Sequence, residues 1–294
     1  MFDLRYHVAS LAAVFFALVI GILVGVGISD RGLVDKVDRR LLQQRIDQLE
    51  GDLGDARTRA SDLAAEQKAA QAFIADTYPT LMRDRLRGKR IALVFLGPAR
   101  PDVRATLEQA LADGGARGWA RVRALKLPLD VPAVDDALAK DPAGRPYVGD
   151  ARLPALGEAL AKELAVGGDA PLWSALAEQI VAERAGAERQ PADGVVVVRS
   201  VGRQYDGTTR FLQGFYKGLI AAPVPVVGVE TAAGDPGSIA AFRRNGISSV
   251  DDVDQASGRL AVALLLAGGK AGHYGLKPSA QDGVLPPLET AASG

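Results

Sequence analysis

The feature that most constrains this chain is the absence of any charged residue between Val8 and Ile28, a run of 21 residues. As an α-helix this run is about 31 Å long, which matches the roughly 30 Å hydrocarbon core of a bilayer. Charged residues flank it on both sides. The run therefore predicts a transmembrane anchor over residues 1–29 and a single-pass protein of the cell membrane.

Two other interpretations of this run remain open. A cleaved secretion signal has an apolar region of usually about 7–15 residues, which is shorter than this run, although Gly25 and Gly27 are the small residues that such cleavage sites need. A buried core helix of a soluble domain normally has one polar face, and this run has none. Its length and its uniform apolarity favour the permanent anchor.

Small residues recur at every fourth position of the run and form one ridge on an α-helix. Such a ridge lets two helix backbones approach closely in a bilayer, so we predict that the anchor pairs with a copy of itself. The alternative is that the spacing arises by chance, because Ala and Gly are common in membrane helices. The ridge residues are Ala9, Ala13, Ala17, Gly21 and Gly25.

The next segment, residues 30–75, is polar, contains no proline and has apolar or small residues at alternating spacings of three and four, with Gln67 as the one polar interruption. This spacing is the seam of a coiled coil, and it predicts a coiled-coil stalk over residues 30–84 that makes the protein a homodimer or higher oligomer. A single amphipathic helix packed on its own domain is the alternative. The seam residues are Ile46, Leu49, Leu53, Ala56, Ala60, Leu63, Ala70 and Ile74.

Residues 88–278 predict an α/β domain with a mostly parallel sheet, because continuous apolar runs alternate with helical patterns. We expect a Rossmann-like or flavodoxin-like domain of three layers, and a disordered tail over residues 279–294. The expected strands are 91–97, 119–127, 195–198, 224–230 and a short one within 247–254. The expected helices are 102–112, 133–139, 154–165, 171–187, 207–221 and 257–267, the last capped by Ser257.

The composition excludes several kinds of function. The 35 basic and 35 acidic residues balance, which argues against a nucleic-acid partner. Cysteine is absent, so disulfides, thiolate metal sites and cysteine nucleophiles are excluded. His273 is the only histidine of the folded region, and neither a GxSxG elbow nor a Walker A loop occurs. We therefore predict that the protein is not an enzyme and has no evident cofactor.

Ligands of such sheets usually bind at the carboxyl ends of the strands. Arg199-Ser200 and Glu230-Thr231 follow two of the expected strands, where they either contact a ligand or are ordinary polar loop residues. The glycine-rich segment 268–275 follows a helix and predicts a tight turn rather than a phosphate cradle.

Four residues are the only candidates for a metal site in the folded region. Three are carboxylates, the ligand type that divalent cations such as Ca²⁺ prefer, and the fourth is the histidine. A solvated acidic loop and a histidine without a metal are the alternatives. The candidates are Asp251, Asp252, Asp254 and His273.

Three segments of the chain resemble segments of a known protein family. SLAAVFFALVIGILVGVGI at 10–28, GKRIALVF at 88–95 and ISSVDDVDQASGRLAVALLLAGGKAGHYG at 247–275 resemble the MctB family of actinobacterial envelope proteins. The resemblance implies copper transport, as export or homeostasis, with the α/β domain outside the cytoplasmic membrane. Copper as a bound metal is implied by the resemblance alone.

Two functions from different classes remain open at this point. The resemblance implies a copper-transport protein of the envelope. The residues themselves favour a non-catalytic scaffold that positions a cell-wall or division partner, because they combine an anchor, an association ridge and a stalk. A domain that binds a nucleotide at the sheet edge has the least support.

Overall fold

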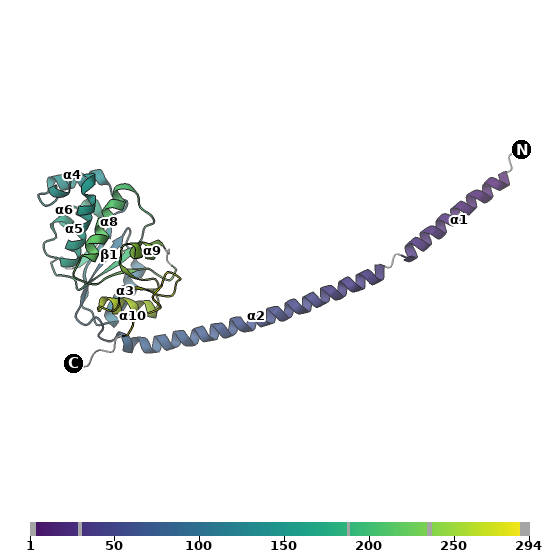
Figure 1. The fold of residues 1–294 in the computed structure, drawn as a ribbon, viewed down its shortest axis with the longest axis horizontal. Helices are drawn as coiled ribbons and strands as arrows, with labels where there is room; N and C mark the ends of the chain where they lie inside the picture. The colour runs from purple at the N-terminus through teal and green to yellow at the C-terminus, as the bar shows by residue number, and fades with distance from the viewer. Residues whose placement is uncertain (1–3, 29–30, 187–188, 234–236, 289–294) are drawn as a thin grey trace. The chain divides into compact units, whose positions relative to one another are not determined.

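Figure 1 shows the computed structural model, which describes residues 4–28, 31–186, 189–233 and 237–288. The chain divides into two compact units, Met1–Ala70 and Gln71–Gly294. The first unit is entirely helical in its described part, and the second contains the sheet.

Helix α1 (Leu4–Ile28) contains the apolar run. Residues His7–Val26 are long and apolar enough to cross a membrane by their length and composition, and none of them is buried in the structure. α1 is therefore not a core helix of the sheet domain. All five ridge residues lie exposed on α1, and their pairing with a second copy stays a prediction.

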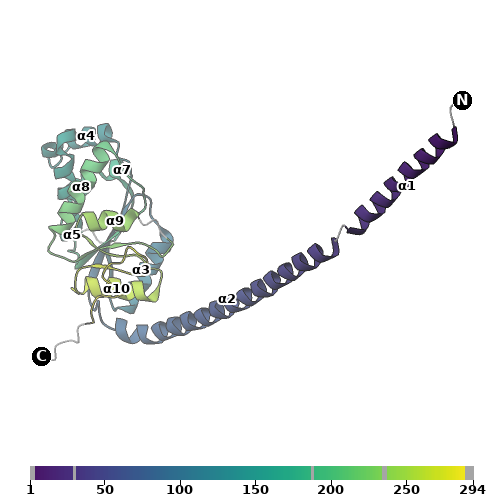
Figure 2. The same cartoon turned by 45° about the vertical axis from the view of Figure 1, so that its right-hand side comes forward.

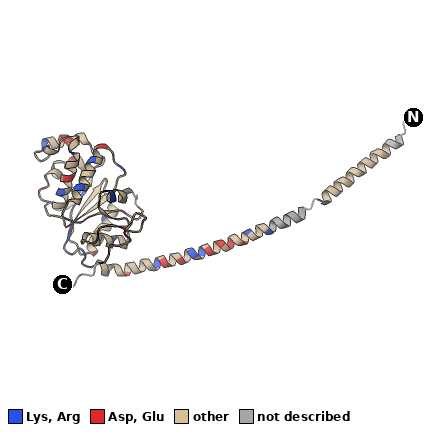
Figure 3. Ribbon diagram, viewed as in Figure 1, with Lys and Arg blue, Asp and Glu red and all other residues tan. Residues whose placement is uncertain are grey.

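Helix α2 (Arg31–Met82) is 52 residues long and contains the whole predicted seam. Charged residues of both signs recur along the coloured part of α2, whereas the coloured part of α1 carries none (Figure 3). The larger seam residues are exposed on the single chain; Leu49 and Leu63 are each 66% exposed. The seam residues are thus exposed along α2, and the coiled coil stays a prediction.

The last turns of α2 are part of the second unit. Tyr78, Met82 and, in the turn that follows, Leu86 are buried in one of the two hydrophobic cores. The Tyr78 hydroxyl donates to Asp113 at 2.8 Å, and the Arg259 guanidinium lies 5.2 Å from the centre of the Tyr78 ring. Side-chain packing therefore joins the end of the predicted stalk to the α/β domain.

One seven-stranded sheet forms the centre of the second unit, in the order β3-β2-β1-β4-β5-β6-β7. Neighbouring strands run parallel, except that β3 pairs antiparallel with β2 at one edge. The predicted mostly parallel sheet is confirmed, and the five expected strands correspond to β1, β2, β4, β5 and β6. The strands are β1 (Arg90–Leu96), β2 (Gly118–Leu125), β3 (Val181–Gly186), β4 (Gly194–Arg199), β5 (Val226–Val229), β6 (Ser248–Val250) and β7 (His273–Tyr274).

Helices cover both faces of this sheet (Figure 2). Because successive side chains of a strand point to opposite faces, Val94 of β1 belongs to one core and Leu93 to the other. The first face packs against α4 (Val131–Lys140), α5 (Leu153–Val166), α6 (Pro171–Ala175), α7 (Ala177–Ile180), α8 (Asp206–Ile220) and α9 (Gly237–Arg244). The second face packs against α3 (Pro101–Asp113), α10 (Ala256–Leu266) and the end of α2. Two short 3-10 turns, Arg145–Tyr147 and Asp150–Arg152, lead from α4 to α5.

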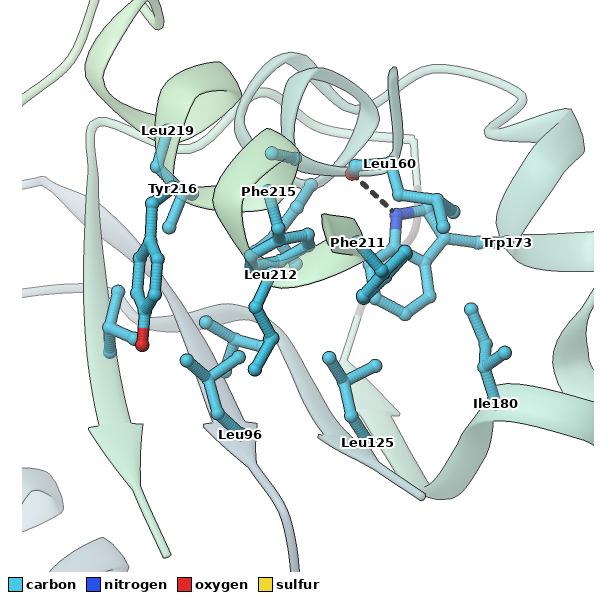
Figure 4. Close-up of a cluster of buried hydrophobic side chains, with 14 of the residues drawn as sticks. Leu96, Leu125, Leu160, Trp173, Ile180, Phe211, Leu212, Phe215, Tyr216 and Leu219 are labelled. Carbon is cyan, nitrogen blue, oxygen red and sulfur yellow. Dashed lines mark hydrogen bonds between the residues drawn. The ribbon is translucent and has the colours of Figure 1, made fainter. Parts of the chain in front are cut away.

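The core of the first face lies between α8 and the strands (Figure 4). Trp173 is buried there, and its indole N–H donates to the Leu160 carbonyl at 2.9 Å. Helices α5 and α8 pack closely because glycine occupies their contact. A Cβ at Gly214 would overlap the carbonyl oxygen of Pro154. The close approach of the α5 and α8 backbones therefore requires glycine at this position.

The expected helix over 171–187 is wrong beyond Ile180. The segment forms two short helices, α6 and α7, and then the edge strand β3, while residues 187–188 lie outside the described part. Ala, Glu and Arg favour helices, but pairing with β2 overrides this local preference. The side chain of Glu183 also pairs with Arg104 at 2.8 Å.

The C-terminal segment differs from the expected tail. Residues 279–288 are described, and Ser279 donates to Asp251 at 2.7 Å while the Gly275 N–H donates to the Gly283 carbonyl at 3.1 Å. These hydrogen bonds hold the segment against the sheet edge. Residues 289–294, the remainder of the predicted tail, lie outside the described residues.

Three smaller expectations need correction. Helix α9 and strand β7 were not expected, and β7 lies in the segment 268–275 that predicts a turn. Ser257 is not the N-cap of α10, because that position is Gln255. The Ser257 hydroxyl instead donates to Asp252 at 2.7 Å.

Candidate functional site

Asp251 and Asp252 follow β6 directly, at the carboxyl end of the sheet, and both are completely buried. The picture of a solvated acidic loop is therefore wrong for these two residues. Only Asp254, three residues further along the chain than Asp251, is exposed. Burial of two carboxylates is costly unless each is hydrogen-bonded, so their partners define what the cluster does.

Asp251 fastens the segment after β7 to the sheet. Its Oδ1 accepts from the backbone N–H groups of Leu276 at 2.9 Å and Lys277 at 3.2 Å, and its Oδ2 accepts from Ser279. A Cβ at Gly275, whose φ is +140°, would overlap the Asp251 carboxylate. Backbone donors and a hydroxyl satisfy this carboxylate, so its role is structural.

Asp252 is less well satisfied. Its Oδ2 accepts from Ser257 at 2.7 Å, whereas its Oδ1 is buried and has no hydrogen-bond partner among the described residues. Burial raises the pKa of Asp252 from 3.8 to about 6, and the neighbouring charges of Asp251 and Asp254 add to the increase. Asp252 thus holds a proton far more readily than an ordinary aspartate does.

The other two metal candidates have separate partners. Asp254 accepts from the Ala232 N–H at 2.6 Å. The Nδ1 of His273 and the Ser249 hydroxyl lie 2.9 Å apart, and burial lowers the pKa of His273. Within residues 4–28, 31–186, 189–233 and 237–288, no group of three His, Asp or Glu side chains comes together to hold a metal ion.

Arg199-Ser200 and Glu230-Thr231 lie around one cavity of about 180 Å³ at the ends of β4 and β5. Lys277 crosses from the C-terminal segment and donates to the Glu230 carboxylate at 2.6 Å and to the Thr231 carbonyl at 2.7 Å. Burial raises the pKa of Glu230, and the charge of Lys277 opposes this. Both pairs that the sequence singled out thus lie where a ligand of such a sheet would bind.

A larger cavity, of about 420 Å³, opens next to it between α8 and α9. We call it the arginine cavity, and Arg199 lines both cavities. Its lining comes from the end of β4, from α8 and from α9. Its main lining residues are Arg199, Arg203, Thr209, Leu212, Tyr216 and Arg244.

Two arginines of this cavity, Arg199 and Arg244, donate to backbone carbonyls. Arg199 donates from Nε to the Val201 carbonyl at 3.0 Å and from Nη2 to the Gly202 carbonyl at 2.7 Å. Arg244 donates to the Ala240 carbonyl at 3.2 Å. In the described part of the chain none of the cavity arginines forms a salt bridge, so the cavity carries an excess of positive charge.

The sequence reasoning missed most of this cavity. Thr209, Leu212 and Tyr216 follow one another at spacings of three and four in α8, which places them on one face of the helix. That spacing was visible in the sequence. The position of Arg244 in the cavity could not be predicted in this way, because Arg244 belongs to α9, a helix that the sequence pattern did not predict.

Two comparisons bear on the identity of the chain. A family model described as "Copper transport outer membrane protein, MctB" matches residues 1–285. A search of curated proteins found no match.

Proposed function

Because the chain belongs to the MctB family of copper transport outer membrane proteins, which matches residues 1–285, we propose that it takes part in copper transport at the cell envelope. In this proposal α1 anchors the chain in the membrane, α1 and α2 join copies of it, and the α/β domain lies outside the cytoplasmic membrane. The family match is the single observation that carries the proposal.

The proposed role is that of a component that supports export without holding copper itself. Cu(I) prefers the sulfur of Cys and Met, and the chain has no Cys and only Met1 and Met82. Met82 is fully buried in a hydrophobic core. The apolar run carries no charged residue that would line an ion path through a bilayer.

Anchoring and association are supported by surface that the chain itself does not cover. Residues of the apolar window of α1 are all exposed, including Leu11 at 75% and Val26 at 71%. Such surface is unfavourable in water and is stable in lipid. The exposed seam of α2 needs a second helix in the same way.

The test is total cellular copper under copper stress, measured by mass spectrometry in cells that lack the chain and in complemented cells. We expect more copper in the cells that lack the chain and a return to the normal amount on complementation. A chain without residues 1–28 should fail to complement, because it has lost the anchor. Equal copper in all of these cells would refute the proposed function.

A matched variant separates support of export from copper binding. A chain with both Asp252→Asn and His273→Ala removes two of the metal candidates but leaves α1 and α2 intact. We expect this variant to complement fully. We also expect the purified wild-type chain, at full length, to retain less than one copper ion per molecule after dialysis. Tight binding of copper at a fixed ratio would contradict the supporting role.

The exposed seam of α2 also favours a second candidate function, a scaffold that positions another envelope protein. In that case a specific partner should copurify with the wild-type chain and be lost on Leu49→Asp with Leu53→Asp. Unchanged cellular copper in the cells that lack the chain would favour this second function over the first.

A further inference from the structure

The arginine cavity has the size and the surroundings of a small-molecule site. Its volume of about 420 Å³ lies within the range of roughly 300–1,000 Å³ that is typical of ligand pockets. Arg199 reaches it from the end of β4, Tyr216 from α8 and Arg244 from the end of α9. Three elements that are distant in the sequence thus supply polar groups to the arginine cavity.

The positive charge of this cavity has no counterpart in the described residues. Arg199, Arg203 and Arg244 all line it, and no described carboxylate pairs with any of them. Arg203 instead lies 5.9 Å from the centre of the Tyr205 ring. Like charges that share a cavity repel one another, and a bound anion removes this repulsion.

A buried hydroxyl without a partner points to the same kind of ligand. Tyr216 is 4% exposed, and its hydroxyl has no hydrogen-bond partner among the described residues. Figure 4 shows this hydroxyl at the end of the ring that is farthest from α8. The Thr209 hydroxyl, on the same face of α8, also lacks a partner. Buried hydroxyls are almost always hydrogen-bonded, so two residues that line this cavity each lack an acceptor.

The phenol can serve as a donor at any physiological pH. Burial raises the pKa of Tyr216 to about 12, although the charges of Arg199 and Arg244 lower it. The cavity therefore presents guanidinium and phenol N–H and O–H donors, which call for an acceptor with several oxygens.

We propose that the arginine cavity binds the phosphate group of a small soluble molecule through Arg199, Arg203 and Arg244, with the Tyr216 hydroxyl as a further donor. One arginine suffices for a carboxylate in a bidentate pair, whereas three arginines match the charge and the oxygens of a phosphate monoester. The side chains of Leu212, Gln213 and Asn245 line the remaining space and contact the rest of the molecule.

The test is calorimetric titration of the purified full-length chain in detergent micelles with ribose 5-phosphate, inorganic phosphate, ribose and acetate. We expect ribose 5-phosphate to bind at one site per chain, and ribose and acetate to give no binding. Inorganic phosphate that binds as tightly as the ester identifies free phosphate as the source of the group. Tighter binding of the ester identifies a phosphorylated molecule. Absence of binding by both phosphate compounds would overturn the proposal, as would equal binding of acetate.

Two variants test whether binding occurs in the arginine cavity. Arg244→Gln should weaken ribose 5-phosphate binding by about tenfold or more, because it removes a charged hydrogen-bond donor. Arg243→Gln is the matched control, since Arg243 precedes it on α9 but does not line the arginine cavity, and it should leave binding unchanged. Equal effects of the two variants would overturn the assignment.

Tyr216→Phe keeps the buried ring and removes only the hydroxyl. Because that hydroxyl has no protein partner, the variant should melt at the wild-type temperature without ligand and still bind ribose 5-phosphate several-fold more weakly. Unchanged affinity would remove Tyr216 from the site. These measurements on purified protein are independent of cellular copper, so they stand or fall separately from the proposed transport role.

Discussion

Asp252 combines complete burial, one hydrogen bond and one unpartnered oxygen, and these together raise its pKa to about 6. The folded protein therefore binds this proton more tightly than the unfolded chain does, where the pKa is near 3.8. Asp252 favours the folded state fully below about pH 4, and this contribution is lost as the pH rises through about 6.

Asp252→Asn should remove this pH dependence. The free energy of unfolding of the variant, minus that of the wild type, should increase by up to about 3 kcal/mol between roughly pH 4 and pH 7.5. Chemical denaturation at several pH values measures this difference. Ser257→Ala removes a hydrogen bond that lowers the pKa of Asp252, so its destabilisation should grow as the pH rises through about 6. A difference that does not change with pH would contradict this account of Asp252.

Gly214 is a residue whose missing side chain matters. A Cβ there would overlap the Pro154 carbonyl in the contact of α5 with α8. We expect Gly214→Ala to lower the free energy of unfolding by about 2 kcal/mol or more, because neither backbone can move without disturbing the core. Ile220→Ala, at an exposed position of the same helix, should change it by less than about 0.5 kcal/mol. Thermal melting of both variants measures the contrast, and equal effects would contradict it.

At the level of single elements, α2 poses the clearest question, because its apolar seam residues are exposed where the structure describes them. The chain contains no cysteine, so a single introduced cysteine reports on pairing without interference. Disulfides form only where Cα atoms approach within about 7 Å, which makes cross-linking a test of register.

Ala56→Cys should give a disulfide-linked dimer on mild oxidation of membranes, because Ala56 lies on the seam. Thr58→Cys lies on the outer face of a coiled coil with this seam and should not. Adding Leu49→Asp and Leu53→Asp should abolish the Ala56→Cys dimer, since each chain then places two charges in the seam. Equal cross-linking at positions 56 and 58 would show that the seam does not pair.

Edge strand β3 shows how one element depends on another. Its residues Val181–Gly186 include two charged side chains, Glu183 and Arg184, which are both exposed and discourage pairing with other sheets. β2 supplies the only strand partner that β3 has in the described sheet. The strand therefore exists because β2 offers an unpaired edge, not because of its own sequence.

At the scale of the whole molecule, the open question is on which side of the membrane the α/β domain lies. The proposed function requires the outer side. Ser174 is exposed at the surface of this domain, and Ser174→Cys creates the only thiol of the chain. A maleimide that cannot cross membranes should label this variant in intact cells as strongly as in lysed cells. Labelling that appears only after lysis would place the domain in the cytoplasm and contradict the proposed topology.

Retention of α1 distinguishes an anchor from a cleaved signal. We expect the chain recovered from membranes to begin at its original N-terminus, as determined by mass spectrometry, and to resist extraction with alkaline carbonate. A mature chain that begins after Gly27 would identify the run as a signal and would remove the ridge from the protein.

Features that depend only on neighbouring residues could be predicted from the amino-acid sequence. Three such features are local patterns, and each predicts its element without reference to the rest of the chain. They are the uncharged run over Val8–Ile28, the heptad-like spacing of α2 and the apolar runs that form β1 and β4. The family followed from segments spread over the chain, and the match over residues 1–285 confirms it.

Which polar residues are buried, and which of them lie close together, could be seen only in the folded chain. Asp251 and Asp252 lie in an acidic stretch that looks solvated, and they are buried because the segment after β7 folds over them. Arg199, Tyr216 and Arg244 come from β4, α8 and α9, and no sequence spacing links them. Their meeting depends on how the helices pack on the sheet, since burial and long-range proximity are properties of the packed chain and not of any local stretch.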